Sequence, residues 1–158
     1  MKKVLIALDY NPTAQKVAEL GFAMATAMKA EIVLLHVITD PVYYSSPEYS
    51  PIMGYKGSME MGSLQRDSIT GLKEASRQFL ETTRQYLGDE SIRTIVKEGD
   101  FADSILSTAN EIHAEIIVMG SHSRKWLKEI VMGSVTEKVL HHTRIPLLII
   151  PTNRKGTK

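Results

Sequence analysis

Cysteine is absent from this chain of 158 residues, which excludes disulfide bonds, thiolate metal sites and cysteine nucleophiles. Charge of one sign is also scarce, because the formal net charge is only +1, so no global field attracts nucleic acid or an acidic membrane. No apolar run reaches the length of a transmembrane helix. These absences predict a cytoplasmic protein that binds neither nucleic acid nor membrane.

Short apolar runs alternate with stretches of helical period along the chain. The first run, residues 4–8, ends at Asp9, which favours a strand over a secretory signal. Runs of this kind are typical of strands buried in a parallel sheet, with helices covering both faces. We therefore predict an α/β fold over residues 1–151, with a doubly wound, five-stranded parallel sheet in a single domain. The expected strands are residues 4–8, 32–38, 92–96, 116–119 and 145–151.

Turn residues mark the expected helix ends. Asn11 before Pro12 predicts the start of the first helix, whose apolar stripe runs to Lys29. A second helix from Arg66 closes at Gly88, and its core-facing stripe includes Phe79 and Tyr86. Asp100 is expected to cap the third helix, and the fourth runs from Ser134 to about His142.

Residues 39–65 show no period and are rich in glycine, proline, serine and tyrosine. We predict a flexible insertion loop, which is either a lid over a ligand or a surface insertion. Residues 152–158 are polar and basic and are predicted to be a disordered tail. His36 interrupts the second apolar run and is interpreted as a hydrogen-bonded core histidine, because no metal-ligand partner sits at usable spacing.

The stretch 115–137 organises the chain. A β-branched run is followed by the small residues Gly120-Ser-His-Ser123, and then by Gly133-Ser134 with Glu137 three residues past the serine. Ser-x-x-Glu predicts a capping box with Ser134 as the N-cap. A small-residue loop between a strand and a helix start can direct backbone N–H groups at one anion, which makes this a candidate phosphate site. A simple turn remains the alternative.

The spacing of these residues resembles the nucleotide motif of the universal stress protein family. That motif is Gly, two residues, Gly, nine residues, Gly, then Ser or Thr, and this chain departs from it at Ser123 in place of the second glycine. The resemblance extends over nearly the whole chain, from Val-Leu-Ile-Ala-Leu-Asp9 to Ile-Pro-Leu-Leu-Ile-Ile-Pro151. The family's frequent proline after the third-strand turn is Phe101 here, a second departure.

The resemblance implies a sheet in the order 3-2-1-4-5 and a homodimer formed through the strand at residues 146–150. It also implies binding of ATP, or of ADP or AMP, together with Mg²⁺. Asp9 would lie by the ribose or adenine, Val37 would meet the adenine through its backbone, and the motif residues would surround the ribose and phosphates. The expected binding residues are Asp9, Val37, Gly99, Met119, Gly120, Ser123, Gly133, Ser134, Val135 and Thr136.

Ser123 leaves two interpretations open. If its position needs positive φ, a non-glycine residue there costs about 1–2 kcal/mol. If its hydroxyl donates to phosphate, a charge-assisted bond worth roughly 1.5–3 kcal/mol offsets that cost. Replacing Ser123 with glycine would tighten nucleotide binding in the first case and weaken it in the second.

The expected function is that of a nucleotide-dependent switch in a stress response, acting on an unidentified protein partner. The alternative is a dimeric interaction module that binds no nucleotide. An enzyme is not favoured, because the phosphate loop Gly-x-x-x-x-Gly-Lys-Ser/Thr, His-x-Gly-His and Ser-Gly-Gly-x-Asp-Ser are all missing. At most, slow ATP hydrolysis is expected.

Overall fold

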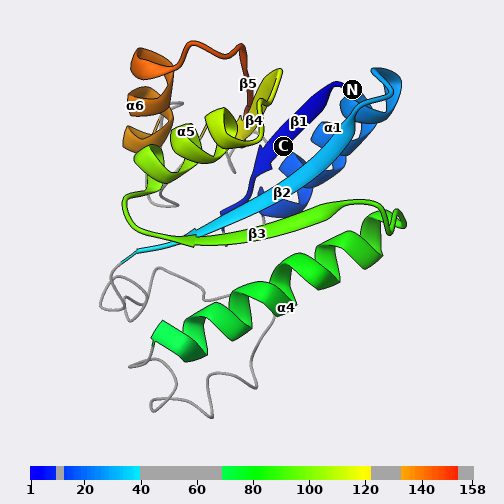
Figure 1. The fold of residues 1–158 in the computed structure, drawn as a ribbon, viewed down its shortest axis with the longest axis vertical. Helices are drawn as coiled ribbons and strands as arrows, with labels where there is room; N and C mark the ends of the chain where they lie inside the picture. The colour runs from blue at the N-terminus through cyan, green and yellow to red at the C-terminus, as the bar shows by residue number, and fades with distance from the viewer. Residues whose placement is uncertain (10–12, 40–68, 122–132, 153–158) are drawn as a thin grey trace.

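The computed structural model describes residues 1–9, 13–39, 69–121 and 133–152. Strands and helices alternate through these ranges, as the sequence predicts (Figure 1). In the described residues, no helix has both the length and the apolar character needed to cross a bilayer. The elements are β1 (Lys3–Ala7), α1 (Thr13–Ala27), β2 (Glu31–Ile38), α4 (Ile69–Leu87), β3 (Arg93–Glu98), α5 (Phe101–Glu111), β4 (Ile116–Gly120), α6 (Ser134–His142) and β5 (Leu147–Ile150).

The five strands form one parallel sheet in the order β3-β2-β1-β4-β5. The predicted fold class and strand order are therefore confirmed. β1 occupies the centre, where it pairs with β2 on one side and with β4 on the other. The chain reverses its direction of winding there, and ligands of such sheets bind outside the carboxyl ends of the strands at this switch.

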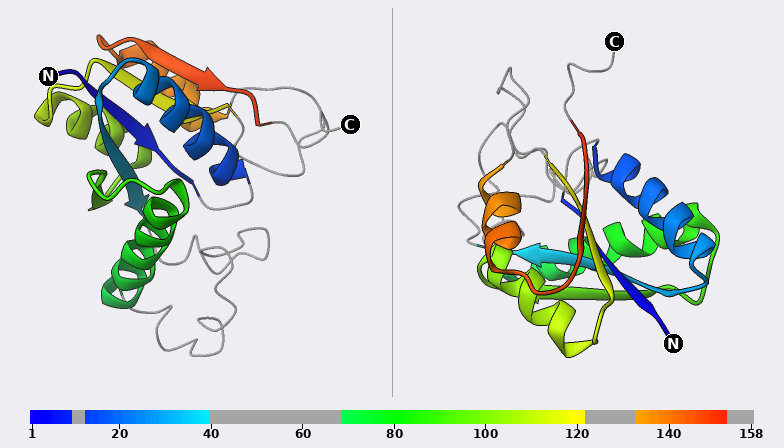
Figure 2. Two further views of the ribbon diagram at one scale, coloured as in Figure 1. Left: turned by 90° about the vertical axis from the view of Figure 1, so that its right-hand side faces the viewer. Right: turned by 90° about the horizontal axis from the view of Figure 1, so that it is seen from above.

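The described helices cover both faces of the sheet (Figure 2). α1 and α4 pack on one face through a core that contains Ile6, Leu34 and Phe79. α5 and α6 pack on the other face, where the core contains Leu35 and Val139. The central strands are buried on both sides, which explains why the sequence shows unbroken apolar runs there instead of alternation.

The helix ends follow the predicted turn chemistry at two positions. Gly88 ends α4 with φ of 77°, and its N–H donates to Arg84 O at 3.0 Å. Asp100 caps α5, because its carboxylate accepts from the Asp103 N–H at 2.9 Å. The expected start of α1 at Asn11 and Pro12 lies outside the described residues.

Other predicted boundaries and one core position were wrong. β3 runs to Glu98 instead of ending at residue 96, and β5 is shorter than the apolar run 145–151. α1 ends at Ala27, before Lys29, which turns with φ of 59°. Tyr86 is 58% exposed, and its hydroxyl donates to Glu19 and accepts from Gln15 at 3.0 Å. The tyrosine thus joins the outer surfaces of α4 and α1, because its hydroxyl favours the solvent side.

Candidate functional site

The carboxyl edge of the central strands brings together predicted site residues from three segments. Asp9 lies two residues beyond β1 and is half-buried, and Val37 is the penultimate residue of β2. Met119 and Gly120 close β4. Since β1 lies between β2 and β4, Asp9 stands between the strand end that carries Val37 and the one that carries Gly120.

The N-terminus of α6 is fastened directly to the end of β4. The Gly133 N–H donates to Ser121 O at 2.8 Å, and the Thr136 hydroxyl donates to Gly120 O at 2.9 Å. These two bonds close the base of the segment 122–132, which lies outside the described residues together with Ser123. The Thr136 hydroxyl therefore gives its proton to a structural partner, and the backbone N–H is the donor of this predicted site residue that remains for a phosphate.

Ser121 is a residue that sequence reasoning missed. Besides accepting from Gly133, it donates its N–H to Ile150 O at 3.0 Å, and its Oγ accepts from the Thr152 N–H at 3.2 Å. Thr152 is buried, which contradicts the prediction that it belongs to a disordered tail, and the rest of that predicted tail, residues 153–158, lies outside the described residues. Ser121 thus links the ends of β4 and β5 to the start of α6.

The packing around Gly120 leaves little room for a side chain. A Cβ atom at this position would lie 3.0 Å from Thr152 Cγ2 and 3.1 Å from Val17 Cγ2, so both neighbours would have to shift by a few tenths of an ångström. Met119 points its side chain into the core, where it is 5% exposed. Both residues can therefore offer a ligand only their backbone.

The start of α6 differs from the predicted capping box. The N-cap is Gly133, with φ of −68° and ψ of 161°, and no side chain of the described residues caps the helix. Ser134 is the first helical residue, so the prediction that Ser134 is the N-cap was wrong. The Gly133 carbonyl accepts from the Glu137 N–H at 2.9 Å. A φ of −68° is open to any residue, so positive φ is not the reason for a glycine here.

An uncapped helix start leaves backbone donors without acceptors. The first N–H groups of a helix have no partner in the preceding turn. In the described part of the chain, no hydrogen bond occupies the N–H groups of Ser134, Val135 and Thr136. They carry the positive end of the helix dipole, so this helix start suits an anion.

The β3–α5 turn is held from both faces of the sheet. Glu98 pairs with Lys73 of α4 at 2.7 Å, and Asp100 pairs with Lys138 of α6 at 3.3 Å. The Asp103 N–H, with a smaller contribution from Lys138, holds the pKa of Asp100 below its usual range. Between them, Gly99 has φ of +136°, a value that favours glycine, and its N–H donates to Ile38 O at 2.9 Å.

Gly99 lies on the same edge of the sheet as the other predicted site residues, but β2 and β1 separate its strand from β4. The structure therefore places it at the margin of the site. Across the described residues, no group of three or more histidine, aspartate or glutamate side chains is arranged to hold a metal ion by itself.

Comparison with known proteins agrees with this architecture. Residues 1–151 match the universal stress protein family. The chain belongs to that family. It is 29% identical to universal stress protein MJ0577 of Methanocaldococcus jannaschii over 94% of each chain. It is 28% identical to universal stress protein YxiE of Bacillus subtilis, over 94% of this chain and 97% of that one.

Solved structures of the universal stress protein family share the fold. The structure of MJ0577 superposes with a TM-score of 0.68, at 28% sequence identity and over 95% of each chain. UspA of Lactobacillus plantarum superposes with a TM-score of 0.70, at 16% identity and over 94% of this chain and 97% of that one. The five-stranded sheet with the order 3-2-1-4-5 thus matches the fold of the MJ0577 structure.

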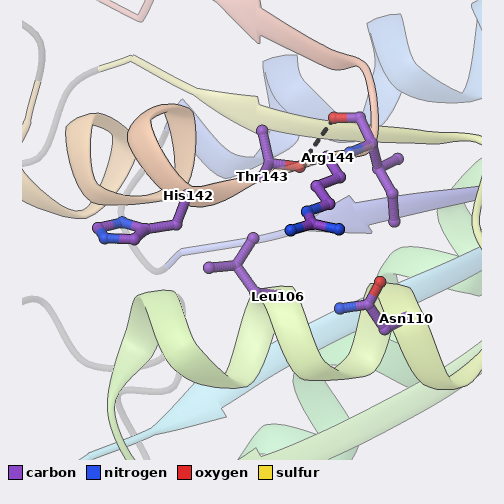
Figure 3. Close-up of a pocket in the computed structure, with 6 residues that line it drawn as sticks. Leu106, Asn110, His142, Thr143 and Arg144 are labelled. Atoms are coloured by element: carbon purple, nitrogen blue, oxygen red, sulfur yellow. Dashed lines mark hydrogen bonds between the residues drawn. The ribbon is translucent and has the colours of Figure 1, made fainter.

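A small open cavity of about 130 Å³ lies beside the loop before β5, on the side of the molecule opposite to the carboxyl ends of the strands (Figure 3). Arg144 reaches from the loop before β5 toward Leu106 and Asn110 of α5. The C-terminal ends of α5 and α6 meet there, and their dipoles disfavour phosphate. This cavity is therefore not the predicted nucleotide site. Its lining residues are Leu106, Asn110, His142, Thr143, Arg144 and Ile145.

Proposed function

We propose that this protein binds an adenine nucleotide, ATP or else ADP or AMP, at the carboxyl edge of its sheet and acts as a nucleotide-dependent switch in a stress response. The observation that carries the proposal is the uncapped start of α6, where Ser134, Val135 and Thr136 present N–H groups beside the end of β4. Backbone donors and a helix dipole bind phosphate without side-chain charge.

The remaining predicted residues take roles that follow from their places on the edge. The α6 N–H groups face the phosphates, and Asp9 on the central strand lies toward the sugar or base. The backbone of Val37 meets the adenine from β2. Mg²⁺ enters with the phosphates and neutralises part of their charge, since a hard cation with few protein ligands is usually held by phosphate oxygens. Ser123, the remaining predicted site residue of the motif, lies outside the described residues, and both interpretations of it stay predictions.

The family supplies independent support. A universal stress protein whose structure covers 96% of this chain and 97% of its own was solved in complex with cAMP, itself an adenine nucleotide. That protein superposes with a TM-score of 0.58 at 17% identity, so it shows the shared fold for this chain. The ligand belongs to that protein, and for this chain the proposal depends on its own α6 start.

Calorimetric titration of nucleotide-free protein with Mg-ATP tests the proposal. We expect saturable binding below millimolar concentration, with GTP weaker because the Val37 backbone would contact the base. No detectable heat at millimolar Mg-ATP would reject the switch and favour the alternative, a dimeric interaction module without nucleotide. The departure from the family motif at Ser123 is the observation that supports this alternative.

We also propose a homodimer that forms through β5. This edge strand carries no charged residue, and Leu148 is 37% exposed. The other edge strand of the sheet, β3, carries Arg93, Lys97 and Glu98. Charges on an edge strand hinder pairing with another chain. The difference between the two edges leaves β5 as the one suited to a second copy, and the cytoplasmic location expected from composition would allow such assembly.

Replacing Leu148 with lysine is expected to convert the dimer to monomer, because it places a charge beside the pairing edge. Sedimentation at micromolar concentration measures the change. Lysine at Thr94, an exposed residue of β3, is the matched control and should leave the dimer intact. A wild-type protein that sediments only at the 17.6 kDa monomer mass would contradict the proposal.

A further inference from the structure

His36 is a polar ring inside an apolar layer. It lies in β2, is 1% exposed, and faces α4, where Phe79 meets it edge-on with ring centroids 5.4 Å apart. A buried polar group is costly unless it is hydrogen-bonded. The Nδ1 atom lies 2.9 Å from the Leu8 carbonyl oxygen. Because a carbonyl only accepts, Nδ1 carries the proton and donates it.

The hydrogen bond from His36 to the Leu8 carbonyl lies just beyond the last paired residue of β1. The paired residues of β1 end at Ala7, yet Leu8 is still held to β2 by its N–H, which donates to Leu35 O at 2.9 Å. In a regular parallel ladder the carbonyl of such a residue takes a backbone N–H. Here the imidazole of His36 supplies a donor to that carbonyl. Both polar groups of Leu8 are therefore bonded to β2.

The hydrogen bond from His36 to Leu8 also affects Asp9, the next residue along the chain. The Leu8 carbonyl and the Asp9 N–H belong to one planar peptide unit, so fixing the direction of the carbonyl also fixes the direction in which the chain enters Asp9. Asp9 stands between β2 and β4 at the carboxyl edge, where the proposed sugar or base contact lies.

We propose that His36 is a positioning residue of the nucleotide site, which orients the Leu8–Asp9 peptide so that the Asp9 carboxylate meets the nucleotide. This inference rests on the proposed function, because Asp9 has a ligand to meet only if nucleotide binds. His36 itself is covered by the core and touches no ligand. It acts only through Asp9.

A double-mutant cycle on the full chain tests the inference. H36N keeps an amide N–H close to the Nδ1 position, whereas H36Q places its amide farther out, near Nε2, and H36L removes the donor altogether. We expect H36Q and H36L to weaken Mg-ATP binding about three- to tenfold, in line with one lost hydrogen bond, and H36N to retain most of the affinity. In a D9A background, the same His36 changes should cause no further loss.

Thr108→Val is the matched control for a change in the core. Thr108 is fully buried in α5, on the other face of the sheet, and its hydroxyl has no hydrogen-bond partner among the described residues. We expect its dissociation constant for Mg-ATP to equal that of the wild type, with thermal melts confirming that each variant is folded during titration. Equal losses in the Asp9 and D9A backgrounds, or no loss in either, would overturn the positioning role alone. An absence of Mg-ATP binding by the wild type would overturn both the role and the proposed function.

Discussion

Replacing Gly133 with aspartate is expected to stabilise the protein and, at the same time, to weaken Mg-ATP binding on the order of a hundredfold. Gly133 is the N-cap of α6 and has backbone angles that any residue can adopt. An aspartate at an N-cap accepts from the N–H of the second or third helical residue, here Val135 or Thr136. Those are the groups that we assign to the phosphates.

Two effects of the aspartate side chain weaken Mg-ATP binding in the Gly133→Asp variant. The carboxylate occupies the donors, and its charge repels phosphate. Unit charges 4 Å apart near a protein surface repel by about 4 kcal/mol, and the Mg²⁺ bound with the phosphates reduces this to the roughly hundredfold effect expected. The same carboxylate interacts favourably with the helix dipole, worth about 0.3–1 kcal/mol. Stability and affinity should therefore change in opposite directions, which general damage to the fold would not produce.

Two matched variants separate capping from charge. Gly133→Ser supplies a neutral cap and should lose affinity to an intermediate degree, whereas Gly133→Ala supplies no cap and should stay within about threefold of the wild type. Calorimetric titration and urea unfolding measure the two quantities. Wild-type affinity in the aspartate variant would show that the α6 start does not bind phosphate.

The free energy of unfolding should fall by roughly 3 kcal/mol on account of His36 alone as the pH drops from 6.5 to 4. Burial lowers the pKa of His36 from 6.5 to about 4, although its bond to the Leu8 carbonyl acts in the opposite direction. Between these values the unfolded chain binds a proton that the folded protein excludes. Stability is therefore fully present above pH 6.5 and is lost as the pH falls toward 4.

Urea unfolding of the wild type and of H36Q at a series of pH values measures the contribution of His36 to the pH dependence of stability. Glutamine does not titrate, so carboxylates such as Glu19 and Asp100, whose pKa values the fold lowers, affect both proteins alike. We expect the two stability curves to run parallel above pH 6.5 and to converge or cross below it. Parallel curves down to pH 4 would show that His36 is protonated freely in the folded protein.

The fold was predictable because the short apolar runs and the turn residues between them all agree with one parallel sheet covered by helices. The runs at 4–8, 32–38 and 116–119 are too short for helices and became the three central strands. Gly88 and Asp100 were read correctly because a left-handed residue and an N-cap depend on a few neighbouring residues. Strand ends were predicted less well, since the partner strand decides where a ladder stops.

Tyr86 and Ser134 show where the sequence is ambiguous. Tyr86 continues an apolar stripe by its spacing, but its hydroxyl finds Glu19 and Gln15 on the neighbouring helix surface, which no local pattern encodes. Gly133 and Ser134 are both acceptable N-caps. The bond from the Gly133 N–H to Ser121 O decides between them, and it joins residues on opposite sides of an eleven-residue segment, 122–132.

The sequence predicted which strand ends would carry the candidate site, but not the contacts between its residues. Sequence spacing pointed to the carboxyl ends of β1, β2 and β4, and the sheet order brings those ends together. The roles of Ser121 and of the Thr136 hydroxyl depend on tertiary hydrogen bonds, and the sequence carries no sign of them. Ser123 lies outside the described residues, so its two interpretations stay predictions.

The most direct test of the proposed site is a titration of isotope-labelled protein with Mg-ATP, followed through its backbone amide resonances. We predict the largest shifts at Ser134, Val135 and Thr136, with smaller shifts at Asp9 and Val37. The amides of Asn110 and Arg144, at the opposite edge of the sheet, should not move. Shifts confined to that opposite edge, or no shifts at millimolar Mg-ATP, would contradict nucleotide binding at the start of α6.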